Sequence, residues 1–380
     1  MNYKKAITEE AVRLLNISDA PDLYHLIRRW ARVHIKHETV APVDVISWPK
    51  GCLMYGLMHV AKTLQKADNS MDRAISVLAT ASVQEYLDRW IKAEAPLYTV
   101  DDALASVSLL YIAEIYEKED PELYSRYMKT AGGVMHFLKC HETDEEGALP
   151  YRPAQKTGQI FADSIGMVVP FAIRYGLMKQ DDDAIDLGMK QITCAMEHLI
   201  DEETHLPWHV YSIKNGRTET YGSPDWGRSL GWIMFGIGSA AEAFTEYPPK
   251  TVVALRARDR LLSALDDLAD TAASYRRPDG LFGSRISDNS SPIDTSASAM
   301  IIYGIMQRDK AVRKDDPAET AESSETIGTT ETAESLSPLL KYINSHGEVG
   351  QAQGECMGIG IYSDNYGSYP WSVGMTMTLI

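Results

Sequence analysis

Three aspartates stand where a loop leads into an apolar stretch of the chain. Asp163 lies in GQIFADSIGMVVPF, close to Phe161 and Ile165, and Asp101 and Asp102 are adjacent in YTVDDALAS. Aspartate is a preferred helix N-cap, so each of them has a structural interpretation. A carboxyl group among apolar neighbours also has a raised pKa, which suits a general acid. Asp163 is therefore a candidate catalytic acid, and either Asp101 or Asp102 is a candidate second carboxylate.

A second group of residues has the chemistry to hold an acidic sugar. Trp226 and Arg228 lie in SPDWGRSLGW, and His209 lies among aromatic residues in LPWHVYS. An aromatic plane can stack on a sugar ring, and a guanidinium group can pair with a carboxylate through two parallel hydrogen bonds. The alternative is structural: a tryptophan packed on its neighbours, an arginine in an internal ion pair and a buried histidine.

The positions of these residues follow a repeat along the chain. Six apolar helical stretches rich in Gly, Ala, Ser and Met each begin after a polar or aromatic loop, and charged amphipathic helices lie between them. The six stretches are WPKGCLMYGLMHVA, VDDALASVSLLYIA, IFADSIGMVVPFAI, WGRSLGWIMFGIG, IDTSASAMIIYGI and YPWSVGMTMTL.

Helical hairpins that cannot bury their own faces must pack on one another. We therefore predict an all-α fold, an (α/α)6 barrel of six helical hairpins closed into a toroid, with one catalytic domain spanning residues 1–380. The N-termini of the six inner helices would then meet around one cavity, which would gather the candidate residues. An acidic segment at about 313–335 has seven acids and no base from Asp315 to Ser335, and it is predicted to be a flexible insertion.

The composition excludes several classes of partner. With 37 basic and 53 acidic residues the net charge is −16, which argues against binding to nucleic acid or to an anionic membrane. No apolar run reaches the roughly 18 residues of a membrane span, and the first residues lack the apolar core of a signal peptide. The four cysteines are scattered, which favours free thiols in a reducing compartment, so we expect a cytoplasmic protein.

The sequence also lacks the motifs of a metal or cofactor site. His34 and His37 are three residues apart but have no third ligand nearby, and a surface helix explains them. The GIG at 358–360 is too short for a dinucleotide-binding fingerprint. We therefore expect neither a metal nor a cofactor, and the sequence does not indicate the oligomeric state.

Four stretches of the sequence resemble the same protein family. DWGRSLGW, IFADSIGMVVPF, DTSASAMIIYGI and EETHLPWHVYS resemble the unsaturated rhamnogalacturonyl hydrolases and, more distantly, the unsaturated glucuronyl hydrolases. The likeness extends from about Trp48 to the C-terminus. The fold of that family is the (α/α)6 barrel. In its reaction an aspartate protonates C4 of the C4=C5 double bond of a terminal unsaturated uronate, water adds at C5, and the neighbouring sugar is released.

The resemblance also implies roles for individual residues. It places the catalytic aspartate at Asp163 and a second aspartate at Asp101 or Asp102. His209, Trp226 and Arg228 match substrate-contacting positions, and Trp48 and Thr295 fall on further positions of the pattern. The implied partner is a small unsaturated oligosaccharide made by a polysaccharide lyase, such as the galacturonyl-rhamnose disaccharide of pectin or, second, an unsaturated glucuronyl substrate.

The chain departs from the family pattern at two points. Ser229 and Leu230 stand where the family more often has Gly-Asn, and Asp294 replaces its usual glutamate. Two alternative functions follow from the same barrel. One is another carbohydrate enzyme, such as a sugar epimerase, which would need paired histidines at the inner helix starts. The other is a non-catalytic sugar-binding protein, which would not need Asp163.

Overall fold

The computed structural model describes residues 2–17, 30, 34–35, 46–151, 158–314 and 336–380. The predicted acidic insertion lies almost entirely outside these residues. The described helices are α1 (Tyr3–Asn16), α3 (Trp48–Leu64), α4 (Ser70–Lys92), α5 (Asp102–Tyr116), α6 (Pro121–Lys139), α7 (Ala162–Lys179), α8 (Asp182–His198), α9 (Gly227–Glu246), α10 (Val252–Tyr275), α11 (Thr295–Lys314) and α13 (Pro370–Met377). The described strands are β1 (Ile160–Phe161), β2 (Val210–Lys214), β3 (Arg217–Tyr221), β4 (Ala352–Gln353) and β5 (Tyr366–Gly367).

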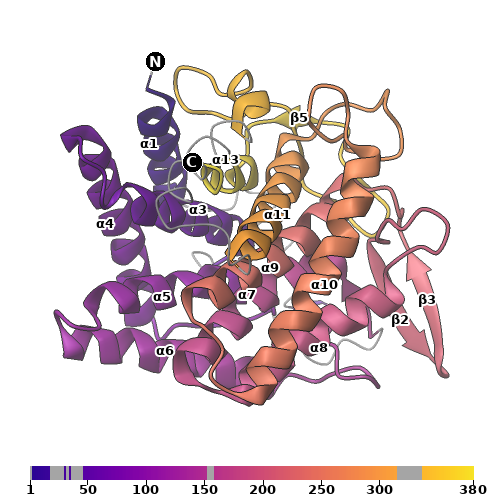
Figure 1. The fold of residues 1–380 in the computed structure, drawn as a ribbon, viewed down its shortest axis with the longest axis horizontal. Helices are drawn as coiled ribbons and strands as arrows, with labels where there is room; N and C mark the ends of the chain where they lie inside the picture. The colour runs from indigo at the N-terminus through magenta and orange to yellow at the C-terminus, as the bar shows by residue number, and fades with distance from the viewer. Residues whose placement is uncertain (1, 18–29, 31–33, 36–45, 152–157, 315–335) are drawn as a thin grey trace.

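The helices form an inner and an outer ring (Figure 1). The inner helices α3, α5, α7, α9, α11 and α13 pack side by side in chain order, and α13 packs against α3, which closes the ring. The outer helices α4, α6, α8 and α10 each pack against the inner helix that precedes them, and α1 packs against α13 and α3. The predicted (α/α)6 architecture is confirmed, and all six predicted inner-helix starts fall at the starts of inner helices.

The small residues of the inner helices allow this ring to close. A Cβ atom at Gly56 of α3 would lie 2.2 Å from the carbonyl oxygen of Gly374 in α13. A Cβ atom at Gly374 would lie 2.3 Å from the carbonyl oxygen of Cys52. Since such approaches are impossible for any larger residue, the first and last inner helices meet only because both carry glycine at the crossing.

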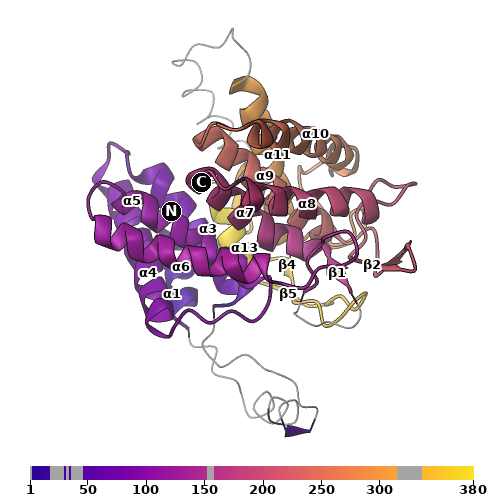
Figure 2. The ribbon, with the colours of Figure 1, turned by 90° about the horizontal axis from the view of Figure 1, so that it is seen from below.

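Short strands connect the loops at which the inner helices begin. Strand β1 pairs antiparallel with β2, and β2 pairs with β3 in a hairpin. The backbone N–H of Ala162, the first residue of α7, donates to the carbonyl of His209 over 2.9 Å. Figure 2 shows β1, β2, β4 and β5 gathered on one side of the molecule. The sheet of β1, β2 and β3 thus fixes the loops before α7 and α9 relative to one another, and β4 pairs with β5 within the loop before α13.

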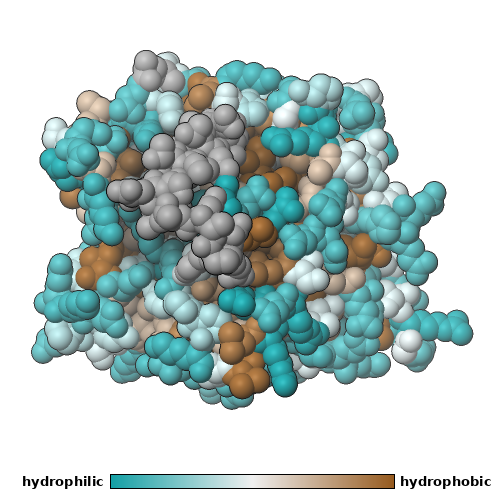
Figure 3. Space-filling view, in the orientation of Figure 1, coloured by the Kyte–Doolittle hydropathy of each residue, from teal (hydrophilic) through white to brown (hydrophobic). Residues whose placement is uncertain are grey.

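The surface is that of a chain whose apolar residues are mostly turned inward. Hydrophilic side chains cover most of the face seen in Figure 3, and the apolar patches between them are scattered. Among the described residues, none of the helices combines the length and the apolar character that crossing a membrane requires.

Candidate active site

A cavity of about 160 Å³ lies where α3, α5, α7 and α9 begin. Six of the predicted site residues line it: Trp48, Asp101, Asp163, His209, Trp226 and Arg228. They come from four inner helix starts and from the loop before β2, up to 180 positions apart in the chain. Tyr151, Phe161, Met167, Trp232, Glu355, Cys356 and Gly358 complete the wall. The cavity therefore collects six of the eight residues that the sequence analysis named as site candidates.

Asp163 lies in the first turn of α7 without capping that helix. The N-cap position is Phe161, and no side chain caps the helix end. The Asp163 side chain is 24% exposed, and its Oδ2 atom lies 3.6 Å from Nε2 of His209. Within the described part of the chain this oxygen accepts no hydrogen bond. The capping interpretation therefore does not apply, and the carboxyl group faces the cavity.

The surroundings of Asp163 favour its protonated form. Burial raises the pKa of this carboxyl to about 6, and the positive charge of Arg228 opposes the shift. A carboxylic acid whose pKa lies near neutrality can both donate a proton and take one back. These are the properties expected of a general acid.

His209 stands in an aromatic enclosure next to this carboxyl group. Its ring lies 4.5 Å from that of Trp226, 5.5 Å from that of Phe161 and 5.6 Å from that of Tyr362. Burial, helped by the charge of Arg228, lowers the pKa of His209 to about 4. The imidazole is therefore neutral near pH 7. Its Nδ1 atom has no hydrogen-bond partner among the described residues and is left for a ligand.

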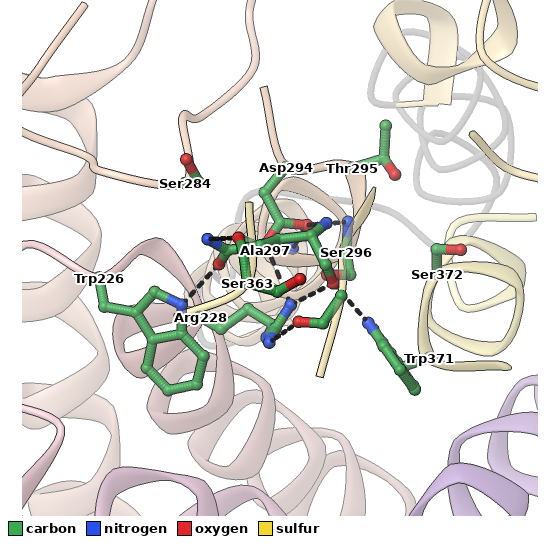
Figure 4. A network of polar contacts seen from close by, with 12 residues as sticks. Trp226, Arg228, Ser284, Asp294, Thr295, Ser296, Ala297, Ser363, Trp371 and Ser372 are labelled. Atoms are coloured by element: carbon green, nitrogen blue, oxygen red, sulfur yellow. Dashed lines mark hydrogen bonds and ion pairs between the residues drawn. The ribbon is translucent and has the colours of Figure 1, made fainter. Parts of the chain in front are cut away.

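Arg228 binds protein atoms more extensively than the sequence predicted. Its Nη1 donates to the carbonyl of Gln353 over 2.5 Å and its Nη2 to the carbonyl of Gly354 over 2.8 Å (Figure 4). Nη1 also lies 3.5 Å from Oδ2 of Asp294. The guanidinium group thus holds the segment after β4, and the bidentate fork that was predicted for a substrate carboxylate is already occupied. Only the positive charge of Arg228 and its unused N–H donors remain available to the substrate.

Gln353 is the residue at the centre of this network, and sequence reasoning missed it. Its Oε1 accepts from Nε1 of Trp226 over 2.8 Å, and its Nε2 donates to the carbonyl of Ser363 over 2.9 Å. Its own carbonyl also accepts from Nε1 of Trp371 over 3.2 Å. Gln353 therefore holds the stacking candidate Trp226 in place and secures the segment that carries Cys356. No local signal marks a glutamine for this task, since the partners lie far apart in sequence.

The two adjacent aspartates have different roles in the structure. Asp101 lines the cavity. Asp102 does not: its Oδ2 accepts from the backbone N–H groups of Tyr98 and Thr99 over 2.7 and 3.1 Å. Asp102 therefore stabilises the turn before α5, although burial raises its pKa to about 6 as well.

Thr295 also lies outside the cavity. It is fully buried, and its hydroxyl donates to the carbonyl of Gly350 over 2.8 Å. Its hydroxyl attaches the loop before β4 to the start of α11 and does not face the cavity. Trp48 does line the cavity, with its ring 4.9 Å from that of Trp371 and 6.0 Å from that of Trp232.

Within the described residues, one group could offer three metal ligands: Glu146, Glu197 and His198. It is not part of the cavity wall. Both ring nitrogens of His198 already have partners, Nε2 with Glu146 and Nδ1 with the hydroxyl of Thr218, each at 2.8 Å. Of the two histidines that the sequence analysis had set aside, His37 lies outside the described residues.

Comparisons with known proteins agree with this fold. The unsaturated rhamnogalacturonyl hydrolase YesR of Bacillus subtilis (strain 168) is 25% identical over 276 residues, 70% of this chain and 72% of that protein. A possible member of glycoside hydrolase family 105 from Salmonella enterica superposes with a TM-score of 0.70 at 19% identity, over 99% of this chain and 92% of that one. The unsaturated glucuronyl hydrolase of Bacillus sp. GL1 superposes with a TM-score of 0.60 at 15% identity, over 98% and 94%.

The solved structures are too distant in sequence to show more than a common fold. The sequence profile of glycosyl hydrolase family 88 matches residues 26–379, which is nearly the whole chain. The protein therefore belongs to glycosyl hydrolase family 88 and is a glycoside hydrolase, as its motifs predicted.

Proposed function

We propose that this protein hydrolyses short oligosaccharides that end in an unsaturated uronate, the kind of product that polysaccharide lyases release. The observation that carries the proposal is Asp163, a carboxyl with a pKa of about 6 that faces the cavity without capping its helix. A relative whose name describes an unsaturated rhamnogalacturonyl hydrolase supports the same substrate class.

The geometry suits protonation of a double bond. The protonated Asp163 donates its proton to C4, and the positive charge that develops at C5 is met by water. The resulting Asp163 carboxylate takes a proton from that water as its oxygen bonds to C5. The hemiketal so formed opens by breaking the bond between C5 and the ring oxygen: the C5 hydroxyl loses its proton to give a ketone, and the ring oxygen takes up a proton. This leaves a hemiacetal at C1, which breaks its bond to the leaving sugar as its hydroxyl loses a proton to give an aldehyde, and the oxygen of the leaving sugar takes up a proton. Asp101, which lines the same cavity, is the candidate for orienting the water.

The remaining wall residues bind the sugar in this proposal. Trp48 and Trp226 offer aromatic faces to the ring, and the neutral His209 offers a nitrogen to a hydroxyl group. Arg228 supplies a buried positive charge for the uronate carboxylate while its hydrogen bonds hold the cavity wall. We propose that one catalytic domain contains all of these residues and that it acts in the cytoplasm, consistent with the four free cysteines.

The first substrate to test is the unsaturated galacturonyl-rhamnose disaccharide from pectin, followed by an unsaturated glucuronyl disaccharide. The conjugated double bond absorbs ultraviolet light and is lost on turnover, so its absorbance measures the reaction directly. The proposal fails if no unsaturated uronyl disaccharide loses this absorbance with active, folded protein. Formation of an epimer from an N-acylated sugar would support the epimerase alternative, and binding without turnover would support the sugar-binding alternative.

A further inference from the structure

A second cavity lies beside the first one. It has a volume of about 620 Å³, and Trp226 lines both cavities. Tyr362 lines the second cavity and stacks on Trp226 with ring centroids 4.9 Å apart and an interplanar angle of 23°. The segment after Gln353 borders both cavities, since Gly358 lines the first and Gly360 the second. The two cavities are therefore adjacent chambers that share an aromatic wall.

The sizes of the two cavities indicate that each binds a different part of an oligosaccharide. At 160 Å³ the first cavity is about as large as a cavity of roughly 150 Å³ that accommodates one benzene ring. It has room for one six-membered ring, which in the proposed function is the unsaturated uronate. Any sugar joined to that ring must lie outside the first cavity, and the second cavity is the larger space next to it.

The second cavity is polar, and the side chains that line it carry more negative than positive charge. Serine and tyrosine hydroxyls line it, together with the carboxylates of Asp225, Asp288 and Asp364 and the guanidinium group of Arg285. Arg285 Nε lies 3.2 Å from Oδ2 of Asp225, so this pair compensates itself. The carboxylates of Asp288 and Asp364 remain as excess negative charge.

The two excess carboxylates are placed to act on a ligand. Hydrogen bonds from Ser290 to Asp288 hold the pKa of that carboxyl below its usual range, so it is ionised at neutral pH. Asp364 is exposed on the segment between Tyr362 and Tyr366, both of which line the chamber. Asp225 has a different task, because its carboxylate also accepts from Ser223 and Ser287 and joins their two loops.

We propose that the second cavity binds the leaving sugar and that Asp288 and Asp364 select against an anionic one. The inference rests on the proposed function and adds which substrates the enzyme distinguishes. Hydroxyl groups of a neutral sugar can donate to the carboxylates and exchange hydrogen bonds with the serines. A carboxylate or sulfate on that sugar would be repelled, because opposed like charges raise the energy of the complex.

The test compares two unsaturated disaccharides that share the terminal galacturonyl group and differ in the leaving sugar. One leaving sugar is neutral and the other is a uronate. We expect wild-type protein to have the higher kcat/KM for the neutral one. In the double variant Asp288→Asn and Asp364→Asn the ratio of the two kcat/KM values should fall about three- to tenfold. Raising the salt concentration should also reduce the wild-type ratio. Exposed charges further apart than about 8 Å are largely screened at physiological ionic strength, and this distance shortens as salt is added.

The matched control is Asp267→Asn with Asp270→Asn, which removes two exposed acids from the outer helix α10. It changes the net charge by the same amount and should leave the ratio unchanged. The proposal is overturned if the ratio does not respond to the Asp288 and Asp364 variant, or if the control variant moves it equally. Failure of the proposed function looks different, because then neither disaccharide is turned over.

Discussion

The two ends of the barrel treat their buried carboxyl groups in opposite ways. Toward the C-terminal halves of the inner helices, Oε2 of Glu242 accepts from the hydroxyls of Tyr55, Tyr111 and Tyr303 over 3.3, 3.3 and 3.1 Å. At the other end, Asp163 and His209 each keep an atom that has no hydrogen-bond partner among the described residues. Buried polar groups are normally satisfied, so an unpartnered carboxyl oxygen that faces a cavity marks where a ligand is expected.

The charges at the two ends differ in the same way. Arg174 is buried, pairs with Glu114 at 3.0 Å and with Glu246 at 2.7 Å, and lies 3.9 Å above the ring of Tyr111. Arg228 lies near Asp294, yet its charge also reaches the Asp163 carboxyl and the His209 ring, whose pKa values it lowers. The end that holds Glu242 and Arg174, here the closed end, is arranged for stability. The end that holds the cavity, here the open end, leaves an acid ready to react.

The largest effect expected is on catalysis, from Asp163→Asn. Asparagine keeps the size and polarity of the side chain, and Asp163 caps no helix, so the fold should persist. Loss of a general acid lowers the rate on the order of 10²–10⁴-fold or more. Turnover of an unsaturated disaccharide measures the effect, with a melting curve as the control for folding. Near-normal activity in the folded variant would remove Asp163 from the mechanism.

Arg174→Met tests the closed end, where we expect a loss of stability. Methionine fills a similar volume but leaves Glu114 and Glu246 without this guanidinium group. Breaking a buried ion pair costs about 3–5 kcal/mol, and the lower value applies here because Glu114 is 38% exposed and Lys62 still pairs with Glu246 at 2.6 Å. Urea denaturation measures the free energy of unfolding. A variant that keeps its stability but loses kcat would contradict the division between the two ends.

The pH dependence of kcat/KM should follow the titration of Asp163, at the open end of the barrel. The acid form of Asp163 is the active one, so activity is present below its pKa of about 6 and is lost as the pH rises through that value. Between pH 6 and 8 the protonated fraction falls about fiftyfold, and kcat/KM should fall with it. His209, with a pKa of about 4, stays neutral over this range. A flat profile from pH 6 to 8 would show that no acid of this pKa controls the reaction.

Arg228→Lys should affect both stability and catalysis. The lysine ammonium keeps the charge but cannot donate to the carbonyls of Gln353 and Gly354 with the geometry of the planar fork. Losing one hydrogen bond from a charged group costs about 1.5–3 kcal/mol of folding stability. Because these bonds hold the cavity wall, kcat/KM should fall as well. The exposure of Cys356 to a thiol reagent tests whether the cavity wall has moved. Unchanged kcat/KM together with an unreactive Cys356 would contradict this role.

Much of this molecule could be predicted from local patterns. The repeat of apolar helices predicted the inner ring, and five residues of the cavity wall lie at the starts of those helices, because helices that run in the same direction bring their N-termini together. The β2–β3 hairpin was missed although its Asn215–Gly216 turn, with φ of 54° and 68°, has the residues that a tight hairpin turn prefers.

Other features could not be predicted because they depend on contacts distant in sequence. Gln353 binds Trp226 across 127 positions, and no spacing near either residue indicates this contact. The same holds for the choice between Asp101 and Asp102. Adjacent residues at a helix start point in different directions, and only the backbone geometry decides which carboxyl group faces the cavity.

The smallest effect should come from Asp102→Asn, which sharpens the comparison between two carboxyl groups. Burial raises the pKa of Asp102 to about 6, as it does that of Asp163. However, Asp102 accepts hydrogen bonds from two backbone N–H groups, and the amide oxygen of asparagine can accept them as well. Activity should therefore stay within about twofold of wild type, and the turn should lose only the charge-assisted part of these bonds, about 1 kcal/mol. Steady-state kinetics of Asp102→Asn and Asp163→Asn, measured on the same substrate, test this prediction. If Asp102→Asn lowers kcat as strongly as Asp163→Asn, the raised pKa rather than the position at the cavity identifies the catalytic acid, and the assignment of the two carboxyl groups is wrong.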